Sequence, residues 1–100
     1  AVDTGSIDIL SASLEFANMG ILAEGMYRNR AYCEKQVDEG SVRTAGCDAL
    51  FDPQTSGGLL AAVAPEDAQR CFEMLQGSVL SAQKIGTLRE YRGGKRIFLK

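Results

Sequence analysis

The side chains best suited to chemistry lie together in one short run of this chain, between Phe51 and Leu60. This run combines a carboxylate, an amide, two hydroxyls and two glycines, which are Asp52, Gln54, Thr55, Ser56, Gly57 and Gly58. Hydroxyl groups and glycine amides can face phosphate oxygens, and a carboxylate can bind Mg²⁺ directly or through water. The run is therefore a candidate phosphate or metal site, with Asp52 as the candidate metal ligand.

The same residue types also make an ordinary turn. Pro53 favours an extended Asp52, short polar side chains bond nearby backbone, and paired glycines permit positive φ or the close approach of another group. An Asx or hydroxyl turn would by itself explain every residue type present, so the sequence leaves both interpretations open. The pattern Gly-x-x-x-x-Gly-Lys-Ser/Thr does not occur, so Gly57-Gly58 is not a phosphate loop of that class.

Other residue types offer little catalytic chemistry. The chain has no histidine, which excludes Ser-His-Asp and Cys-His catalysis within it. Its three cysteines are widely spaced and form no Cys-x-x-Cys pair, so we expect free thiols rather than a zinc site or a disulfide framework. Cys71 lies on the apolar stripe of an expected helix and is interpreted as a core residue. Cys33 and Cys47 occupy polar stretches, which favours exposure.

In the first half of the chain, apolar periodicity predicts helices that would position this run. Ser6 is expected to cap an amphipathic helix with Asp8 in its first turn, and Gly20 to end it. The composition is then polar and weakly periodic, which we interpret as a short helix over 29–38 and a loop over 40–46. A short extended segment over 49–51 would lead into the candidate site.

In the second half, the apolar run Leu59 to Ala64 predicts a strand that is buried on both faces and therefore central in a covered sheet. Pro65 then begins a helix, two acidic residues suit its first turn, and Gly77 ends it. A strand over 79–85 follows, which gives a βαβ-like unit.

The C-terminal segment predicts a hairpin of 88–92 with 95–99 across Gly93-Gly94, with Leu88 facing Leu99. Four basic residues cluster around it, namely Arg89, Arg92, Lys95 and Arg96. We interpret them as charges that protect an edge strand from pairing, in preference to an anion or partner site.

These elements predict one α/β (α+β) layered domain over residues 1–100, partly ferredoxin-like, with helices packed on a small mixed or antiparallel sheet. With 11 basic and 13 acidic residues, the net charge of −2 gives no field that would attract nucleic acid. No apolar run approaches the roughly 18 residues of a membrane span, and the N-terminus lacks a signal-peptide pattern. We therefore expect no nucleic-acid or membrane partner and a cytoplasmic location.

The run Asp52-Pro53-Gln54-Thr55-Ser56-Gly57-Gly58-Leu59-Leu60 resembles the signature in the C-terminal domain of the selenophosphate synthetase family, within the aminoimidazole-ribonucleotide-synthetase superfamily. Flanking segments are also similar to that family: Met19-Gly20-Ile21-Leu22, Gly25, Arg28-Asn29, Ile85-Gly86 and Gly93-Gly94 to Ile97. Where the family has a second Gly and a Thr around Gly25, this chain has Glu24 and Met26. The similarity covers nearly all of the chain, which would be roughly the last third of such an enzyme without the first part of this domain.

This resemblance implies an enzyme that makes selenophosphate, AMP and phosphate from selenide, ATP and water. Family members bind ATP and Mg²⁺ in a cleft between two domains and are homodimers. The nucleophilic Cys or selenocysteine and most metal-binding aspartates belong to the N-terminal domain, so no catalytic residue transfers to this chain. Arg28 and Asn29 are weaker cleft candidates, the alternative being a solvated helix end or an interdomain salt bridge.

The resemblance also implies that this chain supports the ATP and metal cleft but is inactive alone and binds neither ligand tightly. Its expected partners are the N-terminal ATP-binding domain of the same polypeptide and a second subunit. The alternative is a stand-alone ferredoxin-like regulatory or small-ligand-binding module, which would explain a βαβ unit and a hairpin but not the signature.

Overall fold

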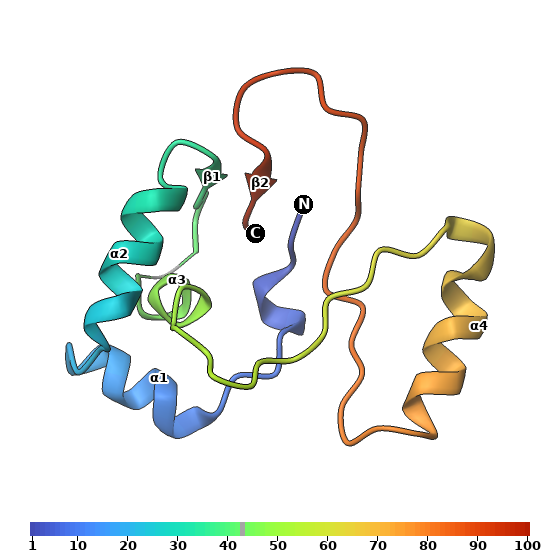
Figure 1. The fold of residues 1–100 in the computed structure, drawn as a ribbon, viewed down its shortest axis with the longest axis horizontal. Helices are drawn as coiled ribbons and strands as arrows, with labels where there is room; N and C mark the ends of the chain where they lie inside the picture. Colours follow the sequence, from blue (N-terminus) through green and yellow to red (C-terminus); the bar gives the residue numbers. More distant parts are fainter. Residues whose placement is uncertain (43) are drawn as a thin grey trace.

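The structure, a computed structural model, describes residues 1–42 and 44–100 (Figure 1). The described chain contains the 3-10 helix η1 (Thr4–Ser6), the helices α1 (Ser11–Asn18), α2 (Glu24–Cys33), α3 (Thr44–Leu50) and α4 (Pro65–Gln76), and the strands β1 (Val37–Asp38) and β2 (Ile97–Phe98). Helices α1 and α2 pack on α3, whereas α4 stands apart and is joined to them by long extended segments (Figure 1). The fold is thus a small mixed α/β arrangement.

The two strands of the sheet in the described chain are parallel, whereas the sequence predicted a mixed or antiparallel sheet. Val37 of β1 pairs with Ile97 of β2, so a strand from the first half of the chain lies beside the C-terminus. Val2 extends this pairing through a parallel bridge to Leu99 and an antiparallel bridge to Gly86. The two termini therefore lie side by side (Figure 1).

The core lies where these strands meet α3. Val37, Cys47 and Leu99 form a buried cluster, and partly buried side chains from both ends of the chain pack against it. Met26 of α2 is fully buried, and Ala17 of α1 is also buried. Every buried residue of the described chain lies between residues 17 and 48 or at Leu99.

The first predicted helix begins later than expected. Ser6 does not cap it; instead Asp3 caps η1, accepting from the amide of Gly5 at 3.2 Å and from the hydroxyl of Ser6 at 3.1 Å. The predicted stop is confirmed, because Gly20 has φ of 75° just after α1. Its amide donates to Ala17 and that of Ile21 to Phe16, which is the Schellman arrangement.

The region between Gly20 and the candidate site was largely mispredicted. Helix α2 begins at Glu24 rather than near residue 29, and residues 37–38 form β1 rather than a helix end. Residues 49–51 are not extended, because α3 continues to Leu50. The predicted loop over 40–46 is partly replaced by α3, and Arg43 of that loop lies outside the described residues. Pairing of β1 with the C-terminal strand, which local sequence does not encode, overrides the weak local pattern.

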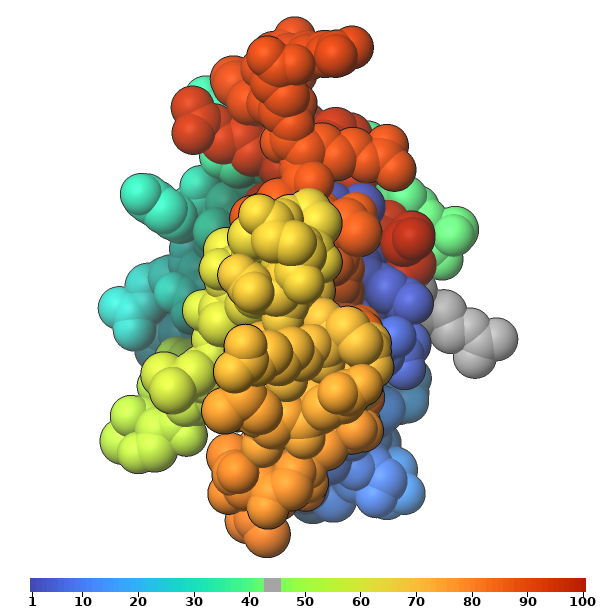
Figure 2. Space-filling model, turned by 90° about the vertical axis from the view of Figure 1, so that its right-hand side faces the viewer, coloured from blue at the N-terminus to red at the C-terminus, as the bar shows by residue number. Residues whose placement is uncertain are grey.

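Helix α4 is confirmed, with Pro65 at its N-terminus and Gly77 at its C-terminal cap. The strands predicted on either side of it, over 59–64 and 79–85, are wrong, since neither segment is assigned to a strand. Leu59 and Leu60 are almost fully exposed instead of central in a sheet. Figure 2 shows α4 and the segment leading into it as a ridge on one face of the molecule.

The predicted C-terminal hairpin is also wrong. Gly93 and Gly94 both have positive φ, as a two-residue turn requires, yet the segments on either side do not pair. Leu88 is exposed and Leu99 is buried, so they do not face one another. The final residues pair with β1 instead, because its neighbouring helices supply the apolar surface that a lone hairpin lacks.

Candidate functional site

The candidate site begins where α3 ends. The amide of Phe51 donates to the carbonyl of Asp48 at 3.0 Å, which closes the last turn of the helix. The chain then leaves the helix, and each residue from Asp52 to Gly58 is exposed. We call residues 52–58 the signature turn.

Inside the signature turn, one pair of side chains is found to bond each other in the described chain. The side-chain amide of Gln54 donates to the carboxylate of Asp52 at 2.7 Å, and no bond from a backbone amide of the described chain to this carboxylate is found. In the described chain no hydrogen bond to protein is found for the hydroxyls of Thr55 and Ser56. Gly57 and Gly58 do not use the positive φ that glycine permits. The interpretation of these residues as a turn that caps its own backbone thus finds no such side-chain bond in the described chain.

Helix α2 contacts the signature turn at two points. The side-chain amide of Asn29 donates to the carbonyl of Phe51 at 2.9 Å. One helical turn earlier, Gly25 lies so close to Pro53 that a Cβ added to it would be 2.8 Å from the ring Cγ. The structure thus brings together two of the segments that carry the family resemblance. Arg28, the neighbour of Asn29, is exposed.

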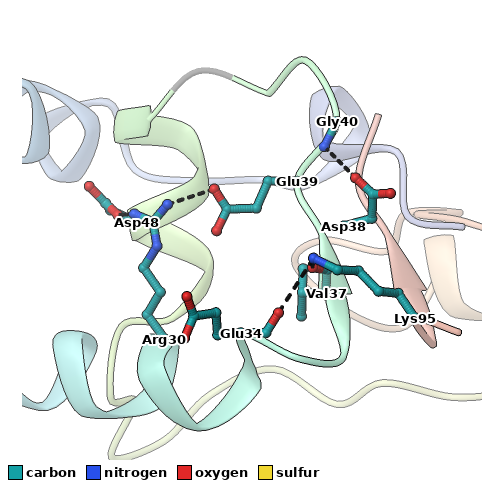
Figure 3. Close-up of polar contacts among 8 residues, drawn as sticks. All are labelled: Arg30, Glu34, Val37, Asp38, Glu39, Gly40, Asp48 and Lys95. Atoms are coloured by element: carbon teal, nitrogen blue, oxygen red, sulfur yellow. Dashed lines mark hydrogen bonds and ion pairs between the residues drawn. The ribbon is translucent and has the colours of Figure 1, made fainter.

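Sequence reasoning missed Arg30, which joins α2 to α3 (Figure 3). Its guanidinium forms an ion pair with Glu39 at 2.6 Å and a second with the buried carboxylate of Asp48. It also lies over the ring of Phe51, 6.0 Å from the centroid. Burial opposes the charge on Arg30, but Glu39 and Asp48 together raise the pKa of this residue above its ordinary value. No local spacing signals this network, because its carboxylates are 9 and 18 residues away.

Cys47 lies beneath this network and is fully buried, so its predicted exposure is wrong. Burial, followed by the hydrogen bond and charge of Glu39, raises the pKa of its thiol to about 11. A thiol that keeps its proton at neutral pH is not a nucleophile. Cys33 and Cys71 are partly buried.

The basic residues near the C-terminus do not converge on an anion site. The ammonium of Lys95 donates to the carbonyl of Val37 at 2.6 Å (Figure 3), and Arg96 stacks on Tyr91 at 4.7 Å from the ring centroid. Arg92 pairs with Glu90 at 3.4 Å, and both side chains are exposed to solvent. Since the expected hairpin does not form, protection of its edge does not explain these charges either. Lys95 instead ties the C-terminal segment to β1.

No group of three His, Cys, Asp or Glu side chains gathers to hold a metal ion within residues 1–42 and 44–100. A metal ion at Asp52 would therefore need further ligands from outside the described chain. The described helices include none that is long and apolar enough to cross a membrane.

No protein-family model and no solved structure matches the chain. Among curated proteins, it is similar along its whole length to selenide, water dikinase of Nitratidesulfovibrio vulgaris, with 36% identity over 102 residues and 29% of that protein covered. The corresponding protein of Clostridioides difficile is 37% identical over 87% of this chain and 26% of its own length. That of Pelobacter propionicus is 46% identical over 73% of this chain and 21% of its own length.

The chain thus spans little more than a quarter of the length of the first two of these relatives. Their name denotes the activity of selenophosphate synthetases, the family that the signature turn and its flanking segments resemble. The resemblance is therefore confirmed: the chain is similar to one part of the selenide, water dikinases.

Proposed function

We propose that this chain is the C-terminal domain of an ATP-dependent selenophosphate synthetase. The complete enzyme would convert selenide, ATP and water to selenophosphate, AMP and phosphate. The observation that carries the proposal is the similarity of the whole chain to 29% of a selenide, water dikinase. A stand-alone ferredoxin-like module finds no comparable support, because the described sheet has two parallel strands.

Within that enzyme, the signature turn would line the ATP and Mg²⁺ cleft. Its hydroxyls at Thr55 and Ser56 and its glycine amides suit phosphate oxygens, and Asp52 suits Mg²⁺ directly or through water. Two observations support this role: the signature turn is exposed, and the described chain provides no bond for either hydroxyl. Arg28 is exposed on the same helix that holds the signature turn, so it is a second candidate for the cleft.

The chain alone would be inactive and would bind ATP and Mg²⁺ weakly. Its partners would be the N-terminal ATP-binding domain of the same polypeptide and a second subunit, in the cytoplasm. The exposed apolar side chains at Leu59, Leu60 and Leu80 suit a piece that the rest of an enzyme covers.

Substitutions in the complete enzyme test this role. Asp52→Ala and Thr55→Ala should each lower selenide-dependent ATP turnover by about 10–100-fold, the range seen when groups around a metal site are removed. Both side chains are exposed, so the melting temperature should change little. Thr87→Ala is the matched control, since Thr87 is also an exposed threonine in an extended segment.

The result that would contradict a cleft role is an unchanged rate with a lowered melting temperature, which would leave a purely structural turn. Titration of ATP into the isolated chain tests the second part of the proposal. We expect no saturation in the micromolar range; micromolar affinity or turnover by this chain alone would contradict it.

A further inference from the structure

The signature turn has little internal support. In the described chain, one side-chain hydrogen bond is found within the signature turn, and it joins Gln54 to Asp52. An exposed turn held by one exposed bond would sample many conformations. Its backbone must therefore be held from outside if its groups are to face a ligand in fixed geometry.

That outside support comes from α2. Asn29 is bonded through its amide group to the carbonyl of Phe51, immediately before the signature turn, at 2.9 Å. This carbonyl belongs to the end of α3, where backbone acceptors have no partner within the helix. The bond thus satisfies an orphan carbonyl and fixes the point at which the chain leaves the helix.

A second contact fixes the next step of the chain. Pro53 packs against Gly25, and only a residue without Cβ allows this approach, since an added Cβ would lie 2.8 Å from the proline ring. Gly25 and Asn29 are one helical turn apart and so lie on the same face of α2. The face that they form touches the chain at residues 51 and 53.

Helix α2, which provides this support, is itself held against α3. Arg30 of α2 pairs with Asp48 of α3, and its guanidinium lies over Phe51. Arg30 thus links the two helices (Figure 3), and the bond from Asn29 joins the first residue after α3 to them.

We infer that Asn29 is a positioning residue, which holds the signature turn through the carbonyl of Phe51 rather than contacting a ligand itself. The inference rests on the proposed function, because the proposed function gives the signature turn a ligand cleft to face. Gly25 contributes to the same support, because its lack of a Cβ leaves room for Pro53. The family resemblance marked Asn29 only as a candidate for the cleft, and the structure assigns its amide another partner.

The first test is hydrogen exchange in the complete protein, which needs no activity. Asn29→Ala should speed exchange of the amides of Phe51 and Asp52 by about tenfold, as expected when one hydrogen bond that restrains them is lost. Alanine favours the helix more than asparagine does, so loss of α2 is not the cause of such a change. Asn18→Ala in α1 is the matched control and should leave these amides unchanged.

The second test is kinetic. In the complete enzyme, Asn29→Ala and the equal-sized Asn29→Asp should each raise KM for MgATP by about tenfold while the melting temperature stays within about 2 °C. Gly25→Ala should act in the same direction by displacing Pro53. Its control is Gly46→Ala in α3, where an added Cβ would meet only an ordinary contact at 3.9 Å.

The outcomes separate this inference from the proposed function. Unchanged exchange at Phe51 and Asp52 in Asn29→Ala would overturn the positioning role whatever the enzyme does. Faster exchange with an unchanged KM would also overturn it, since the bond would then be merely structural. Absence of selenide-dependent ATP turnover in the unsubstituted complete protein would instead overturn the proposed function, while the exchange experiment would still report on Asn29.

Discussion

Residues 1–52 together with 96–100, here called the packed half, differ sharply from residues 53–95, here called the α4 arm. Every residue that is buried in the described chain belongs to the packed half, including Met26, Cys47 and Leu99. The α4 arm contains none, although Leu59, Leu60 and Leu80 are as apolar as any core residue. Apolar residues thus form a core only where other elements cover them.

The two regions differ in what their elements meet. In the packed half, α1 and α2 pack on α3, and α3 contributes Cys47 to the cluster formed with the strand residue Val37 and with Leu99. In the α4 arm, α4 contacts mainly an extended segment, through Lys84, which bonds to Gln69 at 2.6 Å and lies 4.8 Å from the ring centroid of Phe72. Polar contacts of exposed side chains stabilise weakly. We therefore expect the two regions to differ in their response to substitution.

The largest difference is expected for a pair of methionines, both in helices. Met26→Ala in the packed half should lower the free energy of unfolding by about 3 kcal/mol, because its fully buried side chain leaves a cavity. Met74→Ala in the α4 arm should change it by about 0.5 kcal/mol or less, since Met74 is 64% exposed. Urea denaturation of both variants makes the comparison, and equal losses would show that the α4 arm is packed in solution.

The same contrast explains which parts of the fold could be predicted from the sequence. Helix α4 and the stop at Gly20 are encoded locally, by Pro65 at a helix start and by a glycine that accepts positive φ. The pairing of Val37 with Ile97 joins residues that are far apart in sequence, and no local pattern announces it. The strand expected over 59–64 failed for the converse reason, because an apolar run predicts a strand only if neighbouring strands are present to pair with it.

For the candidate site, the sequence indicated the right segments but not their roles. The composition of the signature turn and the Arg28-Asn29 pair singled out two regions that the structure brings together. The bond from Asn29 to Phe51 could not be predicted, because it depends on how α2 packs on α3. The network of Arg30 was missed for the same reason.

An intermediate loss in the free energy of unfolding is expected when ion pairs are broken. Asp48→Asn removes a carboxylate whose side chain is 9% exposed and leaves Arg30 with only Glu39, so we expect a loss of about 2 kcal/mol. Glu90→Gln breaks the pair with Arg92, in which both side chains are at least 79% exposed, and should cost less than about 0.5 kcal/mol. Thermal unfolding at low and high salt would test this, and a comparable loss in both variants would contradict the assignment of Asp48 to the packed half.

At neutral pH, the smallest effect on the free energy of unfolding is expected from titration of the Cys47 thiol, because this contribution vanishes there. Burial, together with Glu39, raises the pKa of Cys47 from an ordinary value of 9.0 to about 11. Below pH 9 the thiol is protonated in both the folded and the unfolded chain. Between pH 9 and about 11 the unfolded chain releases the proton more readily, so this contribution to the free energy of unfolding falls as pH rises.

Cys47→Ala isolates that contribution, because it removes this thiol alone. It should flatten the decline in stability between pH 9 and 11 relative to the unsubstituted chain. Iodoacetamide at pH 8 offers a second readout, since Cys71 is partly exposed and Cys47 is fully buried. Equal alkylation rates of these two cysteines would mean that the packed half opens as readily as the arm, and the distinction between them would not hold.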